Sequence, residues 1–344
     1  MMSKEKLDEV LGHLPGIRVG VVGDFCLDAY WEVDSSRSEI SVETGLPTRP
    51  VRTHRYSLGG AGTVANNLQA MGVGAVSAYG VTGRDPFGYQ MRELMRELGI
   101  CADGLLEQNG DWTTHAYIKP LENGAEASRI DFGNFNQLSD DVARQLADKL
   151  ADDLPNLDVV IINQQVADGI HRSPLFQELL QTLIDAHPDK TFLLDSRDMS
   201  GRYAGTIRKI NACEAMLLMG AEVGPQDPVG LDDAQSAARK LSREWAQPLF
   251  ITRGGHGCLV ADGEQVDVVP GLHITASTDP VGAGDSMVAG IAAGLAADCT
   301  RVEAATFGNF VAGVTVQKLH QTGTATPDEI RAIGERPEYS LLPE

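Results

Sequence analysis

The residues with the clearest chemical potential lie in one segment, DPVGAGDSMVAG, at positions 279–290. Three small residues, Gly282, Ala283 and Gly284, lead into a helix-forming run, so free backbone N–H groups and the positive end of the helix dipole point the same way. Such a turn binds an anion, because glycine lets a phosphate approach the backbone closely. Asp285 follows in the first helical turn, where its carboxylate is either a catalytic base or a cap that interacts with the dipole.

An anion-binding turn beside a carboxylate suits phosphoryl transfer. That reaction needs a positioned hydroxyl, a base for its proton, and donors that stabilise charge on the transferred group. The chain contains neither the P-loop pattern GxxxxGK[ST] nor the motif set of the protein kinases. Gly60, Gly62 and Ala65 have the spacing of a dinucleotide fingerprint, but polar residues precede them where that fingerprint requires a buried strand. The sequence therefore favours a kinase of another architecture.

Four segments, GGAGTVANNLQAMG, KINACE, TRGGHG and DPVGAGDSMVAG, stand in the order found in the ribokinase-like (PfkB) carbohydrate kinases and resemble their motifs. The resemblance covers most of the chain. It implies an α/β fold, with a ribokinase-like doubly wound sheet, helices on both faces and a small β-sheet lid, in one domain over residues 1–344. It also implies ATP-dependent phosphorylation of a sugar hydroxyl, with Mg²⁺ and a monovalent cation as further cofactors.

The resemblance assigns roles to residues within these motifs. Asp285 is the expected catalytic base, and Gly282, Ala283 and Gly284 form the expected anion hole. The residues expected to contact the nucleotide are Asn211, Glu214, Thr252, Arg253, Gly255, Gly257 and Asn309, with Glu214 reaching the metal through water. Asn211 and Glu214 also suit the capping of a helix, so a purely structural role stays open.

The segments GDFCLDAYW and SSRSEISVETGLPTRPV are similar to those of the heptose-phosphate kinases in this family. The similarity implies a sugar or a sugar phosphate as acceptor, with the sugar phosphate preferred and D-glycero-D-manno-heptose 7-phosphate phosphorylated at O1 as the favoured case. The residues expected to contact the sugar are Asp24, Asp28, Arg37, Gly59, Gly60, Asn67 and Arg129. A turn-capping Asp24 and a solvent-facing Arg37 are the structural alternatives.

The basic residues near the first lid segment bear on the acceptor. Arg37, Arg49, Arg52 and Arg55 gather in an acidic chain, and they either receive a substrate phosphate or form an exposed charged strand.

Two residues depart from the family pattern: Thr63 stands where Asn is usual, and Val281 stands where Thr is usual. The first bears on the identity of the sugar and the second on the monovalent-cation site. A nucleoside kinase of the same fold and a non-catalytic sugar or nucleotide sensor are the alternative functions. No nucleotidyltransferase pattern follows the kinase motifs, so we expect any later activation of the sugar to need another protein.

Composition narrows the range of partners. The net charge of −20, without a basic stripe, argues against nucleic acid. Five cysteines without CxxC spacing are expected to be reduced and mostly buried, and His115, His171, His256 and His273 are expected at the surface or in loops. Neither a signal-peptide pattern nor an apolar run of the roughly 20 residues that span a membrane is present. We therefore expect a cytoplasmic protein without a membrane partner, and by family analogy a homodimer formed through the lid.

Strands and helices must position these residues. Apolar runs predict strands at 17–23, 75–83, 158–163, 191–195, 215–220 and 248–255, and short strands within 257–270. Helical patterns occur at 63–71, 87–99, 140–154, 173–186 and 232–246, and twice after Gly282. Alternating polar and apolar residues predict the lid from about 29–57, including a strand at 38–43, and from about 112–132, with a hairpin turn at Glu122, Asn123 and Gly124.

Overall fold

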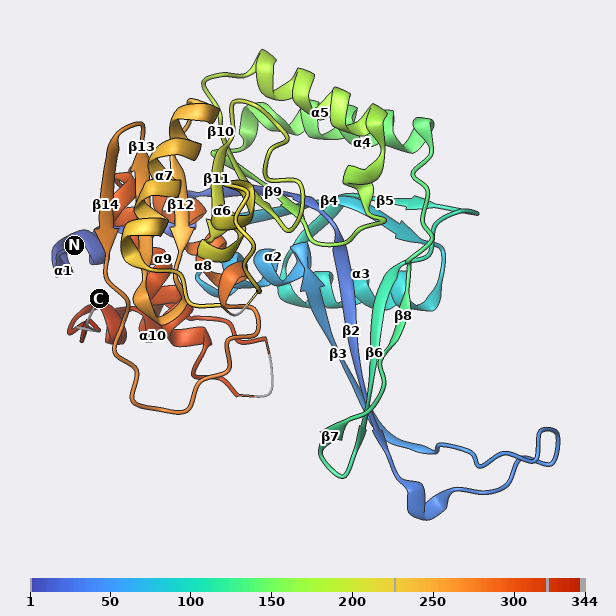
Figure 1. Ribbon diagram of the computed structural model, residues 1–344. Coiled ribbons are helices and arrows are strands. Elements are labelled where there is room, and N and C mark those ends of the chain that lie inside the picture. The colour runs from blue at the N-terminus through green and yellow to red at the C-terminus, as the bar shows by residue number, and fades with distance from the viewer. Residues whose placement is uncertain (1, 226, 320–321, 341–344) are drawn as a thin grey trace.

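A computed structural model of the protein describes residues 2–225, 227–319 and 322–340. Its largest element is a nine-stranded sheet with the order β14-β13-β12-β11-β10-β9-β1-β4-β5 (Figure 1). The strands of this large sheet are β1 (Arg18–Gly23), β4 (Ala75–Gly83), β5 (Cys101–Gln108), β9 (Val159–Gln164), β10 (Thr191–Ser196), β11 (Ile207–Asn211), β12 (Leu249–Thr252), β13 (Cys258–Asp262) and β14 (Gln265–Val269). The pairs from β12 to β5 are parallel, and β13 and β14 are antiparallel additions at one edge.

The inner strands are apolar on both faces, as strands covered by helices must be. Every residue of β9 is buried, and Val21 of β1 lies between Ala78 of β4 and Ile161 of β9. Because parallel strands end at the same edge of a sheet, the polar residues that follow β1, β9, β10 and β11 come together there. This carboxyl edge positions the site.

Helices cover both faces of the large sheet (Figure 1). Those packed in the core with Val19 and Val21 are α1 (Lys4–His13), α2 (Ala61–Ala70), α3 (Pro86–Leu98), α8 (Ala283–Ala296), α9 (Arg301–Thr315) and α10 (Pro327–Gly334). Those on the opposite face are α4 (Asp140–Asp153), α5 (Pro174–Ala186), α6 (Ala212–Leu218) and α7 (Leu231–Trp245). The predicted α/β fold with helices on both faces is confirmed.

A second, smaller sheet, which we call the lid, extends away from the large sheet (Figure 1). Its strands follow the order β3-β2-β6-β7, with β8 also paired to β6. They are β2 (Phe25–Val33), β3 (Val51–Gly60), β6 (His115–Glu122), β7 (Ala125–Glu126) and β8 (Ile130–Phe132). The predicted hairpin turn is confirmed: Glu122 pairs with Ala125, and Asn123 and Gly124 have φ values of 53° and 80°.

Two predicted strands are wrong. Residues 215–220 belong to α6 and the turn after it, because Asn211 and Glu214 form a capping box that starts a helix directly after β11. A short apolar run does not by itself distinguish a strand from a buried helix. Residues 38–43 form no strand, and the segment 34–50 contains a single bridge between Ile40 and Pro47.

The cysteines are mostly buried, as predicted, but two histidines predicted at the surface or in loops are buried as well. All five thiols are free, and Cys26, Cys258 and Cys299 are buried. His115 and His171 are buried as well, contrary to prediction, and burial lowers the pKa of His171 to about 3. Within the described ranges, the apolar helices are all too short to cross a membrane.

Candidate active site

The predicted anion-binding turn is the start of α8. Gly282 is its N-cap with φ 76°, and a Cβ there would lie 2.6 Å from Thr322 Cγ2, so glycine is required. Farther along α8, a Cβ on Gly290 would lie 2.7 Å from the Cα of Gly308 in α9. The two helices therefore touch backbone to backbone, and this packing fixes the turn.

Asp285 occupies the first turn of α8 and is partly exposed. The N-cap position belongs to Gly282, so Asp285 is not the capping residue. Burial raises the pKa of Asp285 to about 7; the charges of Asp195 and Asp28 add to the rise, and Lys209 opposes it. A carboxylate that titrates near neutral pH is well suited to accept a proton.

A cleft of about 940 Å³ opens beside this turn. The predicted nucleotide and phosphate residues that line it are Asn211, Thr252, Arg253, Gly255, Gly257, Ala283, Gly284 and Asn309. Apolar side chains, among them Val229, Leu272 and Ile274, complete its walls. A mainly apolar cleft with a few placed polar groups is typical of a small-molecule site.

Several contacts hold the cleft residues in place. The Thr252 hydroxyl donates to the carbonyl of Ile210 at 3.3 Å, and Asn309 Nδ2 donates to the carbonyl of Pro270 at 3.1 Å. Gly257 has φ 87° and passes so close to Val269 that a Cβ would lie 2.1 Å from its carbonyl oxygen. Arg253 Nε is buried without a hydrogen-bond partner among the described residues, which leaves this donor for a ligand.

Asn211 and Glu214 form the capping box of α6. Asn211 Oδ1 accepts from the Glu214 N–H at 2.9 Å, and Glu214 Oε2 accepts from the Asn211 N–H at 2.7 Å. Burial raises the pKa of Glu214, although the hydrogen bond from Asn211 and the charge of Lys209 oppose the rise. The capping alternative thus describes the contacts that these two side chains make among the described residues, and Glu214 Oε1 takes no part in the capping box.

The site fits a magnesium ion that is held mainly by phosphates and water. No group of three or more His, Cys, Asp or Glu residues suited to a metal occurs in the described part of the chain. Mg²⁺ usually keeps several waters and takes one or two carboxylates together with substrate phosphates. Glu214, beside the cleft, provides one such carboxylate.

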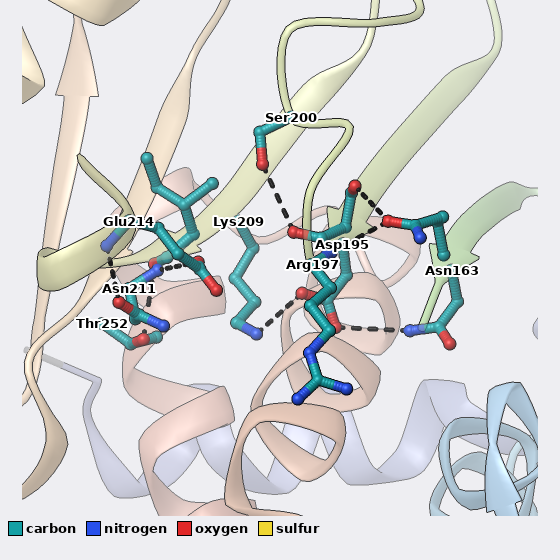
Figure 2. A network of polar contacts seen from close by, with 11 residues as sticks. Asn163, Asp195, Arg197, Ser200, Lys209, Asn211, Glu214 and Thr252 are labelled. Carbon is teal, nitrogen blue, oxygen red and sulfur yellow. Dashed lines mark hydrogen bonds and ion pairs between the residues drawn. The ribbon is translucent and has the colours of Figure 1, made fainter. Parts of the chain in front are cut away.

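A row of polar side chains crosses the carboxyl edge of the large sheet (Figure 2). The strand register places Asn163 beside Asp195, and Asp195 beside Lys209. Asp195 accepts from Asn163 Nδ2 at 3.3 Å and from Lys209 Nζ at 2.8 Å. Lys209 lines the cleft, and a Cβ on Gly284 would lie 3.2 Å from its Nζ.

Neither Asp195 nor Lys209 is predicted from the sequence. One signal could have identified Lys209, which stands two residues before Asn211 in KINACE. Residues two apart in a strand point to the same face, so a functional Asn211 draws attention to Lys209.

Asp28 links the lid to the electrostatic environment of Asp285. It is nearly buried on β2 and forms an ion pair with Lys119 at 2.9 Å. A Cβ on Gly59 would lie 3.3 Å from Asp28 Oδ2, so this glycine keeps the space beside the carboxylate open. Because the charge of Asp28 also raises the pKa of Asp285, the lid carboxylate and the candidate base belong to one electrostatic site.

Arg129 lies on the same lid surface as Asp28. Its guanidinium is 4.4 Å from the ring centre of Tyr117, which is the cross-strand neighbour of Asp28. It also donates to both carboxylate oxygens of Asp131, at 2.6 and 2.7 Å. The structure therefore brings Arg129, Asp28 and Gly59 together.

Tyr30 continues this surface toward the end of β2. The guanidinium of Arg55 lies 3.6 Å from its ring centre and Lys119 Nζ lies 4.9 Å from it. We call the side chains of Asp28, Tyr30, Tyr117, Lys119 and Arg129 the lid face. It combines a carboxylate with cations and aromatic rings.

Three other predicted sugar residues make contacts within the fold. Asp24 accepts three backbone N–H groups from the segment 165–170, which matches its turn-capping alternative. Burial raises the pKa of Asp24 to about 7, against the effect of these donors. Gly60 has φ 57° and passes close to the carbonyl of Asp24, and Asn67 is fully buried and donates to the carbonyl of Thr63 at 3.0 Å.

Arg37 is not brought to the lid face. It is exposed within the segment 34–50, and β2 continues for five residues beyond Asp28, roughly 17 Å, before that segment begins. Two further arginines are paired with carboxylates, Arg52 with Asp34 and Arg49 with Glu122 at 3.1 Å. These exposed pairs agree with the alternative of a solvated charged strand.

Comparison with known proteins identifies relatives across most of the chain. A family model described as pfkB family carbohydrate kinase matches residues 18–329, a span that includes every residue of the candidate site. The bifunctional protein HldE of Desulfatibacillum aliphaticivorans is 32% identical over 317 residues, which are 91% of this chain and 61% of that protein. HldE of Caulobacter vibrioides is 30% identical over 339 residues, 95% and 66% of the two chains. The chain thus spans 61–66% of the length of these relatives.

Solved structures show the same fold. Escherichia coli phosphofructokinase-2 in complex with potassium has a TM-score of 0.69 at 19% identity, covering 92% of this chain and 98% of that chain. Arabidopsis thaliana ribokinase complexed with ribose and ATP has a TM-score of 0.68 at 17% identity, covering 93% and 99%. The large sheet and lid are therefore those of ribokinase-like proteins.

Proposed function

Because the chain belongs to the pfkB family of carbohydrate kinases, which are phosphotransferases acting on sugar hydroxyls, we propose that it uses ATP to phosphorylate a sugar phosphate. The favoured acceptor is D-glycero-D-manno-heptose 7-phosphate, phosphorylated at O1. The observation that carries the proposal is the position of Asp285 in the first turn of α8, directly after the cleft-lining residues Ala283 and Gly284 and within electrostatic reach of Asp28 on the lid. Asp285 is the proposed base.

The proposed reaction is an in-line transfer. Asp285 accepts the proton of the acceptor hydroxyl as its oxygen bonds to the γ-phosphorus of ATP, while the bond from that phosphorus to the β–γ bridging oxygen breaks and ADP leaves. The N–H groups at Gly282, Ala283 and Gly284 stabilise the charge of the transferred group. Mg²⁺, with Glu214 nearby, would neutralise phosphate charge.

The lid face supports a phosphorylated acceptor. Asp28 is placed to accept hydrogen bonds from sugar hydroxyls, and Lys119 and Arg129 supply cationic donors beside it. The similarity to HldE over more than nine tenths of this chain favours a heptose phosphate. Thr63 is buried and its hydroxyl donates to the carbonyl of Leu58 at 3.1 Å, so its difference from the family pattern lies beneath the sugar site.

Exposed apolar side chains on the lid bear on how the protein assembles. Ile40, Val42 and Leu46 are 65%, 102% and 65% exposed in the segment 34–50, and these apolar side chains support a homodimer formed through the lid. We also propose one kinase domain over residues 1–344, with lid segments at about 29–57 and 112–132, and a cytoplasmic location. The net charge of −20 supports the absence of a nucleic-acid partner. A monovalent cation near Val281 is a further proposed cofactor.

Release of ADP from ATP tests the function. The acceptors are heptose 7-phosphate, the same heptose without phosphate, other sugars and sugar phosphates, and adenosine. The proposal expects strong turnover of the phosphorylated heptose. Preferred turnover of adenosine would instead identify a nucleoside kinase, and ligand binding without ADP release from any acceptor would identify a sensor.

Arg129→Gln tests the phosphate contact. A charge-assisted hydrogen bond contributes about 1.5–3 kcal/mol, so the KM for the sugar phosphate should rise roughly 10- to 100-fold. The KM for the unphosphorylated sugar should stay within about threefold. Arg144→Gln, on the exposed surface of α4, is the matched control. Equal effects of Arg129→Gln on both acceptors would contradict a phosphate role.

A further inference from the structure

The proposed transfer of a phosphoryl group with Asp285 as the base assigns no role to the ion pair between Asp195 and Lys209. Its side chains are only 8% and 9% exposed. Removing two charges from water costs several kcal/mol each, and apolar residues of similar volume stabilise a core as well or better. A buried ion pair at the edge of a ligand cleft therefore calls for an explanation other than stability.

The sheet register places this pair next to the candidate anion-binding turn at Gly282, Ala283 and Gly284. Asp195 and Lys209 are direct neighbours on β10 and β11. They share a sheet face with Leu193 and Phe250, which pack in the same core as α8. Lys209 Nζ approaches the backbone of Gly284 closely enough that a Cβ there would lie 3.2 Å away.

Lys209 is charged, and its bond to Asp195 leaves further N–H donors for a ligand. An ammonium group has three N–H donors, and the bond to Asp195 at 2.8 Å uses one of them. Burial alone lowers the pKa of Lys209, but the charge and hydrogen bond of Asp195, helped by Asp285 and Glu214, raise it overall. Asp195 is itself held by Asn163 from the other side (Figure 2).

We propose that Lys209 binds the phosphoryl group during its transfer and that Asp195 is the positioning residue that aims Lys209 at the turn Gly282–Gly284. This inference rests on the proposed role of Asp285 as the base. As the acceptor oxygen bonds to phosphorus and the bond to the bridging oxygen breaks, Lys209 keeps its protons and donates to the phosphoryl oxygens. The proton of the acceptor goes to Asp285.

The first test needs no acceptor. Calorimetry measures the binding of ADP and of an ATP analogue with a β–γ imido bridge, both with Mg²⁺, to wild type and to Lys209→Met. Loss of a charge-assisted bond to the terminal phosphate should weaken the analogue at least about tenfold and ADP less than about threefold. Lys149→Met, which breaks a lysine–aspartate pair on α4, is the matched control and should change neither affinity. Equal weakening of analogue and ADP would overturn the proposal.

A double variant separates the loss of a ligand contact from the loss of stability. Lys209→Met alone leaves a buried carboxylate without its partner, which destabilises the fold, whereas Lys209→Met with Asp195→Asn removes both charges. The double variant should show the same selective loss of the analogue. A double variant that keeps the affinity of wild type for the analogue would overturn the role of Lys209.

Turnover and its pH dependence test the role of Asp195. Lys209→Met should lower kcat roughly 10²- to 10³-fold, and a kcat within threefold of wild type would overturn the proposal. The charged groups that face Asp285 are Asp195 on β10, Lys209 on β11 and Asp28 on β2. Asp195→Asn removes a negative charge and should move the acidic limb of kcat/KM to lower pH, whereas Lys209→Met should move it to higher pH.

The direction of these movements separates positioning from a general structural effect. If the acidic limb of kcat/KM moves in the same direction along the pH axis in Asp195→Asn and in Lys209→Met, the assignment of Asp195 would be overturned. If wild type releases no ADP with any acceptor, the proposed function fails, but the difference between analogue and ADP still decides the role of Lys209.

Discussion

Replacing Asp285 with Asn should remove most of the turnover and leave nucleotide binding in place. Asn has nearly the same size but accepts no proton, and a general base contributes about 10²- to 10⁴-fold, so kcat should fall by about that factor. The residues that line the cleft are unchanged, so ADP affinity should stay within about threefold. In wild type, kcat/KM should rise with pH and level off above about 7, because the base must be ionised. The residual activity of the variant should lack this limb.

The same carboxyl makes the stability of the protein depend on pH. Its folded-state pKa of about 7 lies above the ordinary 3.8, so the folded state binds the proton more tightly than the unfolded state. The resulting stabilisation is present at low pH and is lost as the pH rises through about 7. At about 1.36 kcal/mol per pH unit, the change has an upper bound of roughly 4 kcal/mol. Solvent reaches part of Asp285, so we expect about 2 kcal/mol.

Urea unfolding at pH 5 and pH 8 measures this effect. Relative to wild type, Asp285→Asn should gain less than about 1 kcal/mol at pH 5 and about 2 kcal/mol at pH 8, since Asn avoids the buried negative charge. Asp189→Asn, in the exposed turn between α5 and β10, is the matched control and should show no pH-dependent difference. A variant that keeps more than a tenth of wild-type turnover, or that is less stable than wild type at pH 8, would refute this account of Asp285.

Three further predictions concern structure around the site. Asp24→Ala leaves three N–H groups of the segment 165–170, one buried and two partly buried, without their acceptor, and should lower the free energy of unfolding by roughly 3 kcal/mol in urea titrations, with Asp24→Asn losing less. Gly282→Ala forces φ 76° on alanine and a clash with Thr322, and should lower kcat roughly 100-fold while ADP still binds in calorimetry. Leu46→Asp places a charge on the proposed dimer surface, and sedimentation should show monomers where wild type forms dimers; an unchanged dimer would place the interface elsewhere.

The parts of the site that lie in contiguous motifs could be predicted from the sequence. Gly282 to Asp285 form one turn, and the conformation of such a turn depends on its own small residues. The loop after β12 and the capping box of α6 are local in the same sense. Their shared cleft follows from the common carboxyl edge of parallel strands.

The parts that depend on distant pairing could not be predicted. Asp195 and Lys209 meet through strand register, and nothing within TFLLDS distinguishes Asp195 from an ordinary residue at a strand end. The partners of Asp24 lie 141–146 residues away along the chain. His115 and His171 are buried by elements that pack on them from elsewhere in the fold, which a spacing argument does not register.

Helices α8 and α9 cross at Gly290 and Gly308, where neither helix has a side chain that could move aside. A single added methyl group at that crossing would separate the two helices and shift the start of α8, although it lies more than one helical turn from Asp285. The tolerance of the chain to mutation is therefore uneven. We expect natural variation to be low along this crossing and to accumulate in the mostly exposed lid segment 34–50, so that new acceptor preferences evolve on one sheet while the transfer machinery of the other stays unchanged.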